Sequence, residues 1–208
     1  MKVLVACEYS GVVRDAFHKL GHDATSCDLL PTDSPGKHYE GDIMDILYWD
    51  WDLIIAHPPC TYLCNSGVSW LHKDPDRWGQ LDEGAAFFKL FLDHPCEMVC
   101  VENPVMHKYA VERIGGVRQS QSVQPYEYGH PVSKRTCLWL KGLPLLKPTN
   151  ILEKPESGRW ENQTPSGRCN LPPSLDRWKL RSKTYEGIAE AMANQWPGKV
   201  AKQLTFFV

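Results

Sequence analysis

Three short apolar runs constrain the fold of this chain most strongly, because each has the length of a buried strand and is followed by residues that end it. The runs are Lys2–Ala6 (KVLVA), Asp52–Ala56 (DLIIA) and Glu97–Val101 (EMVCV). The second leads directly into His57-Pro58-Pro59, which neither a helix nor a strand continues, and the third into Glu102-Asn103-Pro104. Continuous apolar runs of this length are typical of strands that are buried on both faces of a parallel sheet.

Patterns with helical spacing separate these strands. Apolar side chains recur at helical spacing after the first run, up to Gly21, and again over residues 80–92 and 185–196. Weaker strand patterns cover residues 23–28 and 136–140. This alternation of strands and helices predicts an α/β fold with a largely parallel sheet and right-handed crossovers.

Length and composition fit one globular domain. The chain has 208 residues, of which 42% are hydrophobic and 23% are charged, which is enough apolar material for a sizeable core. No apolar run approaches the ~18 residues that a membrane-spanning helix needs, and Lys2 leads into a strand pattern and not into a signal peptide. We therefore expect a soluble, cytoplasmic protein without a membrane partner.

Charge is distributed unevenly along the chain. Residues 1–102 have a net charge of −10, whereas residues 103–183 have a net charge of +8. Within the basic part, residues 141–183 lack periodicity, are rich in Pro and Gly, and carry a net charge of +5. Basic residues interleaved with tryptophan suit a nucleic-acid strand, whereas the alternative is a solvated loop whose tryptophans pack on the core. The candidate contacts are Trp160, Arg177 and Arg181, within a group that also includes Arg159, Arg168, Trp178 and Lys179.

The eight cysteines do not have the paired spacing of a zinc ribbon. Cys60 and Cys64 with His57 form one conceivable set of metal ligands, but Cys100, which belongs to a second conceivable set, lies in an apolar strand pattern. We expect free thiols and no metal.

Residues with distinct chemistry follow successive strands of the predicted sheet. Residues 8–11 follow the first strand, Asp28 ends the second, and Cys60 and Glu102 follow the two later apolar runs. Because ligands bind at the carboxyl ends of the strands in an open parallel sheet, we expect these residues to meet at one edge.

Each of these positions allows a functional and a structural interpretation. Backbone amides after Ser10-Gly11 could hold a nucleotide at a helix N-terminus, although neither GxGxxG nor GxxxxGK[ST] is present. Asp28 suits hydrogen bonds to ribose hydroxyls, or is only a loop acid. Cys60 is well placed as a nucleophile if a positive group lowers its pKa, or is a buried structural cysteine.

Six short motifs occur in order across residues 1–140. They are Tyr9-Ser10-Gly11, the acid Asp28, Gly41-Asp42-Ile43, Pro58-Pro59-Cys60, Glu102-Asn103-Pro104 and Pro131–Leu138. Their order and spacing resemble the cytosine carbon-5 methyltransferase family, in a compact form of the kind that phages carry. The matching family motifs are Phe-x-Gly, the acid after the second strand, Gly-Asp-Ile, the Pro-Cys loop, Glu-Asn-Val and Pro-Gln-x-Arg-x-Arg.

The chain departs from the family pattern at several points. Val13 stands where the family usually has a second glycine, Thr61 replaces a usual Gln, and residues 184–187 replace a Gly-Asn-Ser-Val. The region after Arg135 is also far shorter than the family's target-recognition domain.

The resemblance implies a Rossmann-like, S-adenosylmethionine-dependent methyltransferase fold with helices on both faces of the sheet. Residues 1–208 would form a single methyltransferase domain, in which residues 141–183 replace the target-recognition domain. The implied reaction is transfer of a methyl group from S-adenosylmethionine to carbon 5 of cytosine in DNA, single or double stranded, inside a bacterial or phage-infected cell.

The resemblance also implies roles for individual residues. Cys60 would add as a thiolate to carbon 6, Glu102 would hold N3 and the exocyclic amine, and Arg135, or Lys134, would support the ring electrostatically. A base in DNA would have to leave the stack first. The implied cofactor contacts are Tyr9, Ser10, Gly11, Asp28, Asp42 and Pro58, and the implied substrate contacts are Asn103 and Lys134.

Other functions stay open at this point. A carbon-5 methyltransferase of free cytosine nucleotides such as dCMP is the main alternative, because the recognition domain is missing. An amino-methyltransferase shares the Pro-Pro loop but would follow it with an aromatic residue, where this chain has Cys60. A nucleic-acid-binding module without activity would be expected to lose Cys60 or Glu102, and both are present.

Overall fold

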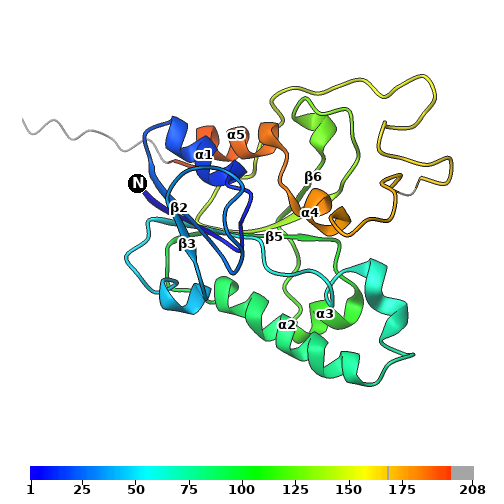
Figure 1. Ribbon diagram of the computed structural model, residues 1–208, viewed down its shortest axis with the longest axis horizontal. Helices are drawn as coiled ribbons and strands as arrows, with labels where there is room; N and C mark the ends of the chain where they lie inside the picture. Colours follow the sequence, from blue (N-terminus) through cyan, green and yellow to red (C-terminus); the bar gives the residue numbers. More distant parts are fainter. Residues whose placement is uncertain (168, 198–208) are drawn as a thin grey trace, which may run out of the picture.

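The computed structural model describes residues 1–167 and 169–197; Arg168, one of the basic residues of the predicted nucleic-acid-binding segment, lies outside the described residues. Over the described residues the fold is α/β (Figure 1). A mixed, mostly parallel sheet of seven strands has the order β3-β2-β1-β4-β5-β7-β6. The predicted α/β class and largely parallel sheet are therefore confirmed, and the architecture is compatible with a Rossmann-like fold.

Five parallel strands form the body of the sheet. β1 pairs with β2 on one side and with β4 on the other, so the strand order reverses between β1 and β4. Open sheets of this kind bind ligands at such a switch point, beyond the carboxyl ends of the strands. The strands are β1 (Lys2–Ala6), β2 (Asp23–Asp28), β3 (His38–Glu40), β4 (Leu53–Ala56), β5 (Met98–Pro104), β6 (Gln121–Val123) and β7 (Thr136–Lys141).

β7 runs antiparallel to β5 and pairs Glu102 with Leu138 and Pro104 with Thr136. β5 consequently continues through Pro104, whereas the sequence predicted that the strand would end before Glu102. Proline ends many strands because it lacks a backbone N–H, but here β7 supplies a partner strand as far as Pro104. The antiparallel direction also brings Lys134, just before β7, to the edge where the parallel strands end.

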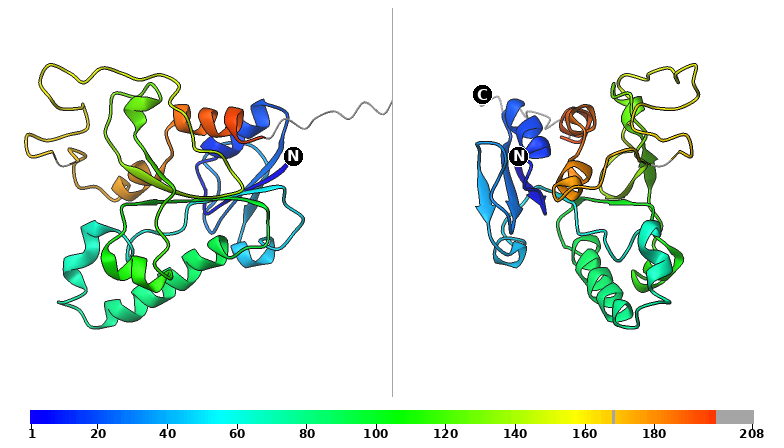
Figure 2. Two further views of the ribbon diagram at one scale, coloured as in Figure 1. Left: turned by 180° about the vertical axis from the view of Figure 1, so that it is seen from behind. Right: turned by 45° about the vertical axis from the view of Figure 1, so that its right-hand side comes forward.

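Helices cover both faces of the sheet, as the family resemblance implied (Figures 1 and 2). α1 (Val12–Lys19) and α5 (Glu186–Gln195) lie on one face. α2 (Asp76–Leu92) and α3 (Lys108–Arg113) lie on the other. The sheet is therefore buried between two helical layers, which explains why its central strands read as continuous apolar runs.

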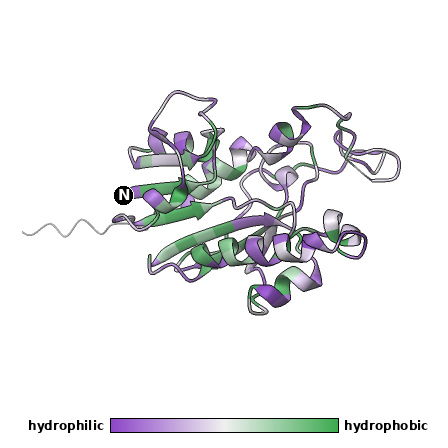
Figure 3. Ribbon diagram, turned by 60° about the horizontal axis from the view of Figure 1, so that its bottom comes forward, coloured by the Kyte–Doolittle hydropathy of each residue, from purple (hydrophilic) through white to green (hydrophobic). Residues whose placement is uncertain are grey.

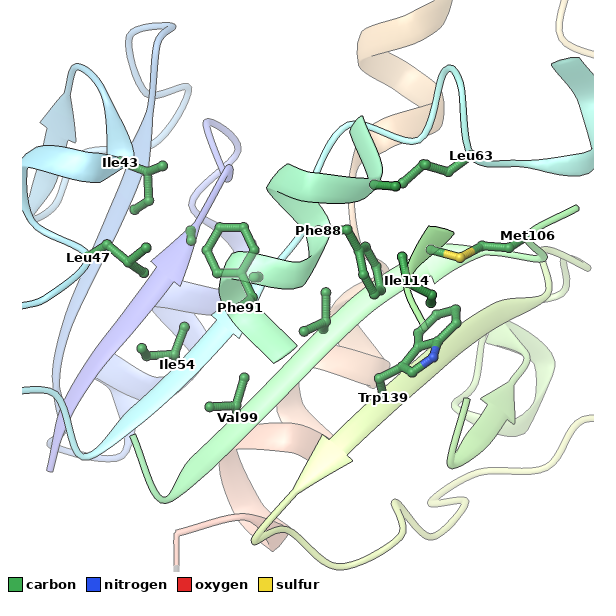
Figure 4. Packing of buried hydrophobic residues seen from close by; sticks show 14 of the residues in the cluster. Ile43, Leu47, Ile54, Leu63, Phe88, Phe91, Val99, Met106, Ile114 and Trp139 are labelled. Atoms are coloured by element: carbon green, nitrogen blue, oxygen red, sulfur yellow. The ribbon is translucent and has the colours of Figure 1, made fainter. Parts of the chain in front are cut away.

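Successive side chains of each strand enter different layers. On β1, Leu4 belongs to the cluster beneath α2 and α3, whereas Val3 and Val5 belong to the cluster beneath α1 and α5. Figure 3 shows the central strands as hydrophobic and the helices as mixed. In the cluster of Figure 4, Phe88 of α2 meets Trp139 of β7 edge to face, with the ring centroids 5.1 Å apart.

The remaining differences from prediction concern short elements and boundaries. β3, β6 and α3 were not predicted, because elements of three to six residues are too short to show periodicity. α2 begins at Asp76, four residues before the predicted start. α4 (Arg177–Ser182) lies inside the segment that was predicted to be irregular. In residues 1–167 and 169–197 no helix is both long and apolar enough to cross a membrane.

Candidate active site

A cavity of about 130 Å³ lies at the carboxyl edge of the sheet, beside the switch point between β1 and β4. Its walls come from the turn after β1, the loop after β4, the end of β5, the residues before β7 and residues 181–184. The residues after β1 and β4 and those at the end of β5 converge here as expected, whereas Asp28 at the end of β2 does not line the cavity. Of the predicted site residues, the cavity is lined by Tyr9, Ser10, Pro58, Cys60, Glu102, Asn103, Lys134 and Arg181.

Cys60 stands at the start of a tight loop that is anchored in the core. The backbone amides of Leu63 and Cys64 both donate to the Cys60 carbonyl at 3.1 Å. The Leu63 side chain is fully buried in the cluster beneath α2 (Figure 4). The amide of His107, in the chain after β5, donates to the Leu63 carbonyl at 3.1 Å. The predicted nucleophile is therefore carried by a backbone that two other segments hold in place.

The thiol of Cys60 forms a hydrogen-bonded pair with the thiol of Cys64. The hydrogen bond from Cys60 lowers the pKa of Cys64, and Ser66 adds to this effect, with its Oγ 2.9 Å from the Cys64 sulfur. The same hydrogen bond, together with burial, raises the pKa of Cys60. One negative charge is thus stabilised on the pair, while a second ionisation is disfavoured. From the sequence, Cys64 was considered only as a metal ligand, because the pairing of the two cysteines depends on the helical turn of this loop.

Glu102 is half-buried on β5 and faces His57, whose Nδ1 lies 3.5 Å from Oε2 of Glu102. Burial raises the pKa of Glu102, but the hydrogen bond and charge of His57 oppose it, with further contributions from Lys134 and Thr136. The sum holds the pKa of Glu102 below its usual range. Glu102 is therefore a carboxylate at neutral pH.

Lys134 supplies a cation beside Glu102 and Cys60. Burial lowers the pKa of Lys134, and the electrostatic interactions with Glu102 and with Cys60 oppose this shift. Its Nζ donates to the Lys183 carbonyl at 3.3 Å. Arg135, the other basic residue predicted for this role, is exposed, and Lys134 is the one that lines the cavity.

Asn103 is fully buried and ties β5 to the Cys60 loop. Its Nδ2 donates to the Pro58 carbonyl at 3.0 Å. Its Oδ1 is buried and has no hydrogen-bond partner in the described part of the chain. Because buried acceptors are rarely left unsatisfied, this oxygen at the cavity wall is available to a donor of a bound ligand.

Glu8 closes the turn after β1. Its carboxylate accepts the amides of Val13 at 2.7 Å and Arg14 at 3.2 Å, at the start of α1. The expectation that amides of this helix N-terminus are free to hold a nucleotide is therefore corrected, because Glu8 occupies them. Burial raises the pKa of Glu8. Gly11 has a φ of 74°, in the left-handed region, and a Cβ there would collide with the guanidinium of Arg14.

Residues 177–184, which we call the cover, close one side of the cavity. The Tyr9 hydroxyl donates to the Lys179 carbonyl at 2.8 Å, so this predicted cofactor contact is buried beneath the cover. The Lys183 ammonium pairs with Asp33 at 2.7 Å. The cover is thus fixed to the loops after β1 and β2 by a few polar contacts.

The two acids predicted to hold the cofactor lie beside the cavity and not on its wall. Asp28 is half-buried at the end of β2, where its Oδ1 accepts the Leu30 amide at 3.0 Å and burial raises its pKa. Asp42 is exposed and caps the following turn by accepting the Met44 amide at 2.9 Å. Burial and both acids raise the pKa of Cys7, which lines the cavity and has a left-handed φ of 58°. Cys7 therefore lines the cavity and lies within electrostatic range of both acids.

The predicted nucleic-acid contacts separate into two groups. Trp160 is buried and stacks on Tyr126, with the ring centroids 4.7 Å apart and the planes within 4° of parallel. Its ring is therefore not available to a base, as the alternative of a core-packed tryptophan anticipated. Arg181 lines the cavity, Arg177 is half-buried, and Trp178 is 52% exposed.

A larger hollow of about 340 Å³ lies along α2, between Tyr48, Lys89 and Arg113. It is lined by no thiol, and its acids, Asp82 and Asp93, are exposed. It therefore offers no reactive group comparable to those of the smaller cavity. In residues 1–167 and 169–197, no group of three or more His, Cys, Asp or Glu side chains is arranged to hold a metal.

The contact between His57 and Glu102 was missed, although the sequence contains a signal for it. His57 ends an otherwise apolar run directly before the two prolines, and it was considered only as a metal ligand. Because β4 and β5 are parallel and Ala56 pairs with Val101, the residues that follow these two come side by side. The sequence alone did not specify this register.

The cavity thus combines the Cys60 thiol, a carboxylate, a lysine side chain and an amide oxygen without a partner among the described residues, while Cys64 is not part of its lining. Such a set can add a sulfur nucleophile to an electron-poor ring, hold the ring by hydrogen bonds and offset the charge that develops. The chain matches none of the known family models and none of the curated proteins with which it was compared.

Proposed function

We propose that this protein transfers the methyl group of S-adenosylmethionine to carbon 5 of cytosine in DNA. The observation that carries the proposal is the convergence of Cys60, Glu102 and Lys134 on one cavity at the carboxyl edge of the sheet. Two further points support it. The motifs that contain these residues resemble those of the cytosine carbon-5 methyltransferases, and the α/β sheet is compatible with the Rossmann-like fold that the resemblance implies.

The proposed chemistry begins at Cys60. Carbon 5 of cytosine is a poor nucleophile until a thiolate adds at carbon 6. Without a substrate, the pKa directions place the proton on Cys60 and the negative charge on Cys64, so the proposed attack requires that the proton passes from the Cys60 sulfur to the Cys64 sulfur. Lys134, which interacts electrostatically with Cys60, would stabilise the thiolate that results.

Glu102, Asn103 and Lys134 would bind the ring. The Glu102 carboxylate suits the exocyclic amine and a protonated N3, and the free Oδ1 of Asn103 suits a second donor of the substrate. An enclosed, largely buried site strengthens each of these interactions relative to water.

S-adenosylmethionine would be held by Tyr9, Ser10 and Pro58 at the cavity and by Gly11, Asp28 and Asp42 beside it, and when bound it would supply an electrophilic methyl group. The donor set fits this cofactor, because carboxylates suit ribose hydroxyls and the adenine amine, and the buried Glu8 suits a sulfonium cation. A cavity of about 130 Å³ is smaller than the ~300 Å³ at which small-molecule pockets begin. We infer that the cover moves to admit the cofactor.

A second candidate is methylation of free cytosine nucleotides such as dCMP. Lys134, Arg181 and Lys183 bring three basic residues to one small cavity, which is enough for a single phosphate. The burial of Trp160 also removes one of the aromatic residues that would stack on a nucleic-acid strand. This alternative predicts turnover without any polymer.

Incubation with methyl-labelled S-adenosylmethionine separates these candidates. Duplex DNA, single-stranded DNA and dCMP are offered in parallel, and the labelled base is identified after digestion to nucleosides. Label in 5-methylcytosine from DNA supports the proposal, and label only in dCMP replaces it with the alternative. Label on the exocyclic nitrogen indicates an amino-methyltransferase, and no label in any of the three substrates overturns both candidates.

A further inference from the structure

The sheet itself brings His57 against Glu102. Ala56 of β4 pairs with Val101 of β5, and the following residues are His57 and Glu102. The amide of His57 donates to the Ala6 carbonyl at 2.9 Å, so β1 also fixes its backbone. With Nδ1 of His57 3.5 Å from Oε2 of Glu102, the pair is within ion-pair distance and close to a hydrogen bond. Catalytic hydrogen bonds are often this long before a substrate binds.

The second ring nitrogen of His57 lies in the interior of the protein. Its Nε2 is buried and has no hydrogen-bond partner in the described part of the chain. The buried carboxyl of Glu8 acts electrostatically on the ring from the turn after β1. The remaining titratable and charged groups that line the cavity with His57 are Cys7, Tyr9, Cys60, Lys134, Arg181 and Lys183.

Because Glu102 is ionised, it has no proton of its own to donate in the proposed reaction. When a thiolate adds to carbon 6 of cytosine, N3 has to take up a proton if no full negative charge is to develop on the ring. The pKa of Glu102 is held below its usual range, so its carboxyl carries no proton at neutral pH. A donor behind Glu102 is needed, and an imidazolium changes its charge readily near neutral pH.

We propose that His57 is a positioning residue that stores, on Nδ1, the proton that Glu102 passes to N3 of the cytosine ring. This inference rests on the proposed carbon-5 methyl transfer and extends it to a residue outside the motifs that resemble the family. His57 acts through Glu102 and has no contact of its own with the reacting atoms.

The proton and the electron pairs balance over one cycle. As the Cys60 sulfur bonds to carbon 6, the pair of the 5,6 double bond moves between carbons 4 and 5. Glu102 takes the Nδ1 proton of His57 and passes it to N3 as the pair of the 3,4 double bond moves onto that nitrogen. After carbon 5 has gained the methyl group, N3 returns its proton to His57 through Glu102. The carbon-5 hydrogen then leaves as a proton to solvent water, its bonding pair restores the 5,6 double bond, and the Cys60 sulfur leaves with the pair of the carbon–sulfur bond, so His57 and Glu102 end the cycle unchanged.

The coupling of the two residues is measurable without any turnover. In protein labelled with ¹³C at the glutamate carboxyls, the Glu102 signal is assigned by its loss in Glu102→Gln. We expect the pKa of Glu102 to rise in His57→Gln, because burial remains while the opposing contact is removed. The matched control is His94→Gln, which replaces another buried histidine far along the chain and should leave the Glu102 titration in place.

Turnover then tests the role of the stored proton. In His57→Gln and His57→Asn we expect kcat for label transfer to fall by at least about tenfold, with KM changed by less than about threefold. Imidazole added to His57→Ala should restore part of the lost kcat, which a merely structural role of the ring does not explain. Thermal unfolding of each variant shows whether it is folded, and His57→Asn, the smaller change, replaces His57→Gln if that variant is not.

The outcomes are distinct. If the wild-type chain transfers label but His57→Gln and His57→Asn keep full kcat, the inference is overturned and the proposed function stands. An unchanged Glu102 titration in both variants overturns it as well. If the wild-type chain labels no substrate, the proposed function fails and the relay with it, while the carboxyl titration still decides whether the two side chains are coupled.

Discussion

The two walls of the cavity are held by different kinds of contact. One wall is formed by the ends of the strands. Here the buried side chains of Glu8 and Asn103 form hydrogen bonds of 2.7 to 3.2 Å with backbone groups, and water cannot replace a partner that is lost at these buried positions. The cover is held by single hydrogen bonds and by the pair of Lys183 and Asp33, whose side chains are 40% and 39% exposed. Unsatisfied buried groups cost about 1–3 kcal/mol each, whereas an exposed ion pair contributes about 0–1 kcal/mol. The wall of strand ends, which carries the reactive groups, is therefore the rigid wall of the cavity, and the cover is its weakly held wall.

The strongest test of the rigid wall is Cys60→Ser. We expect label transfer to fall on the order of 10³-fold or more, because a serine hydroxyl is far less ionised and less nucleophilic than a thiol. Binding of S-adenosylmethionine, measured by calorimetry, should persist.

Cys64→Ser is the matched control for this variant. It should keep most of the activity, because Cys64 belongs to none of the motifs that resemble the family and is not among the residues that line the cavity. If Cys64 proves essential and Cys60 dispensable, the two sulfurs have the opposite roles.

Asp28→Ala probes the border of the rigid wall. We expect the binding free energy of S-adenosylmethionine, measured by calorimetry, to weaken by about 1.5–3 kcal/mol, a factor of roughly 10 to 150 in affinity. The reason is that the cofactor would lose charge-assisted hydrogen bonds to the Asp28 carboxylate. Asp42→Ala should have a smaller effect, because Asp42 is exposed. Asp50→Ala serves as a control, since Asp50 is an exposed acid that pairs with Lys2. Unchanged affinity in both test variants would remove the cofactor assignment.

Charge reversal on the cover tests whether the cover binds a polyanion. If Arg177 and Arg181 each neutralise a phosphate, the double change to Glu should reduce the slope of log affinity against log salt by roughly 1.5 to 2 for an oligonucleotide. Arg118→Glu is the control, because Arg118 precedes β6 and lies near the opposite edge of the sheet. An enzyme for mononucleotides would bind no oligonucleotide at low salt, and this outcome would argue against DNA as the substrate.

The smallest effect is expected from Asp33→Asn, which removes the ion pair with Lys183. We expect the free energy of unfolding, measured in urea, to fall by less than about 1 kcal/mol, because both side chains are well exposed. Stopped-flow binding of S-adenosylmethionine should become faster, since the cover opens more readily. A loss above about 2 kcal/mol would show that the cover is an integral part of the fold and not a weakly held wall.

The fold could be predicted where one element carries its own signal. The apolar runs before His57 and before Glu102 are long enough to specify buried strands by themselves. β3 and β6, with three residues each, exist only through their partners, and the extension of β5 to Pro104 depends on β7. The pairing of two distant segments cannot be predicted from the sequence of either segment alone.

The candidate site divides in the same way. Cys60, Glu102 and Lys134 could be named because each residue type follows or precedes a recognisable strand. The thiol pair depends on the helical turn of a loop, and the contact of His57 with Glu102 depends on strand register. The burial of Trp160 depends on Tyr126, in a segment that gave no periodic signal.

The direction of β7 has a consequence for the length of the chain that follows it. β7 begins beside the cavity and runs back for six residues, so its end lies roughly 20 Å away, at the opposite edge of the sheet. Residues 142–176 then have to return over that distance before α4 can reach the cavity. They act as a tether whose minimum length is set by the height of the sheet. Part of this return is held against the chain before β7, where Trp160 stacks on Tyr126 and the Asn162 side chain hydrogen-bonds the Ser133 backbone, so an insertion that leaves the cover in place has to avoid these residues.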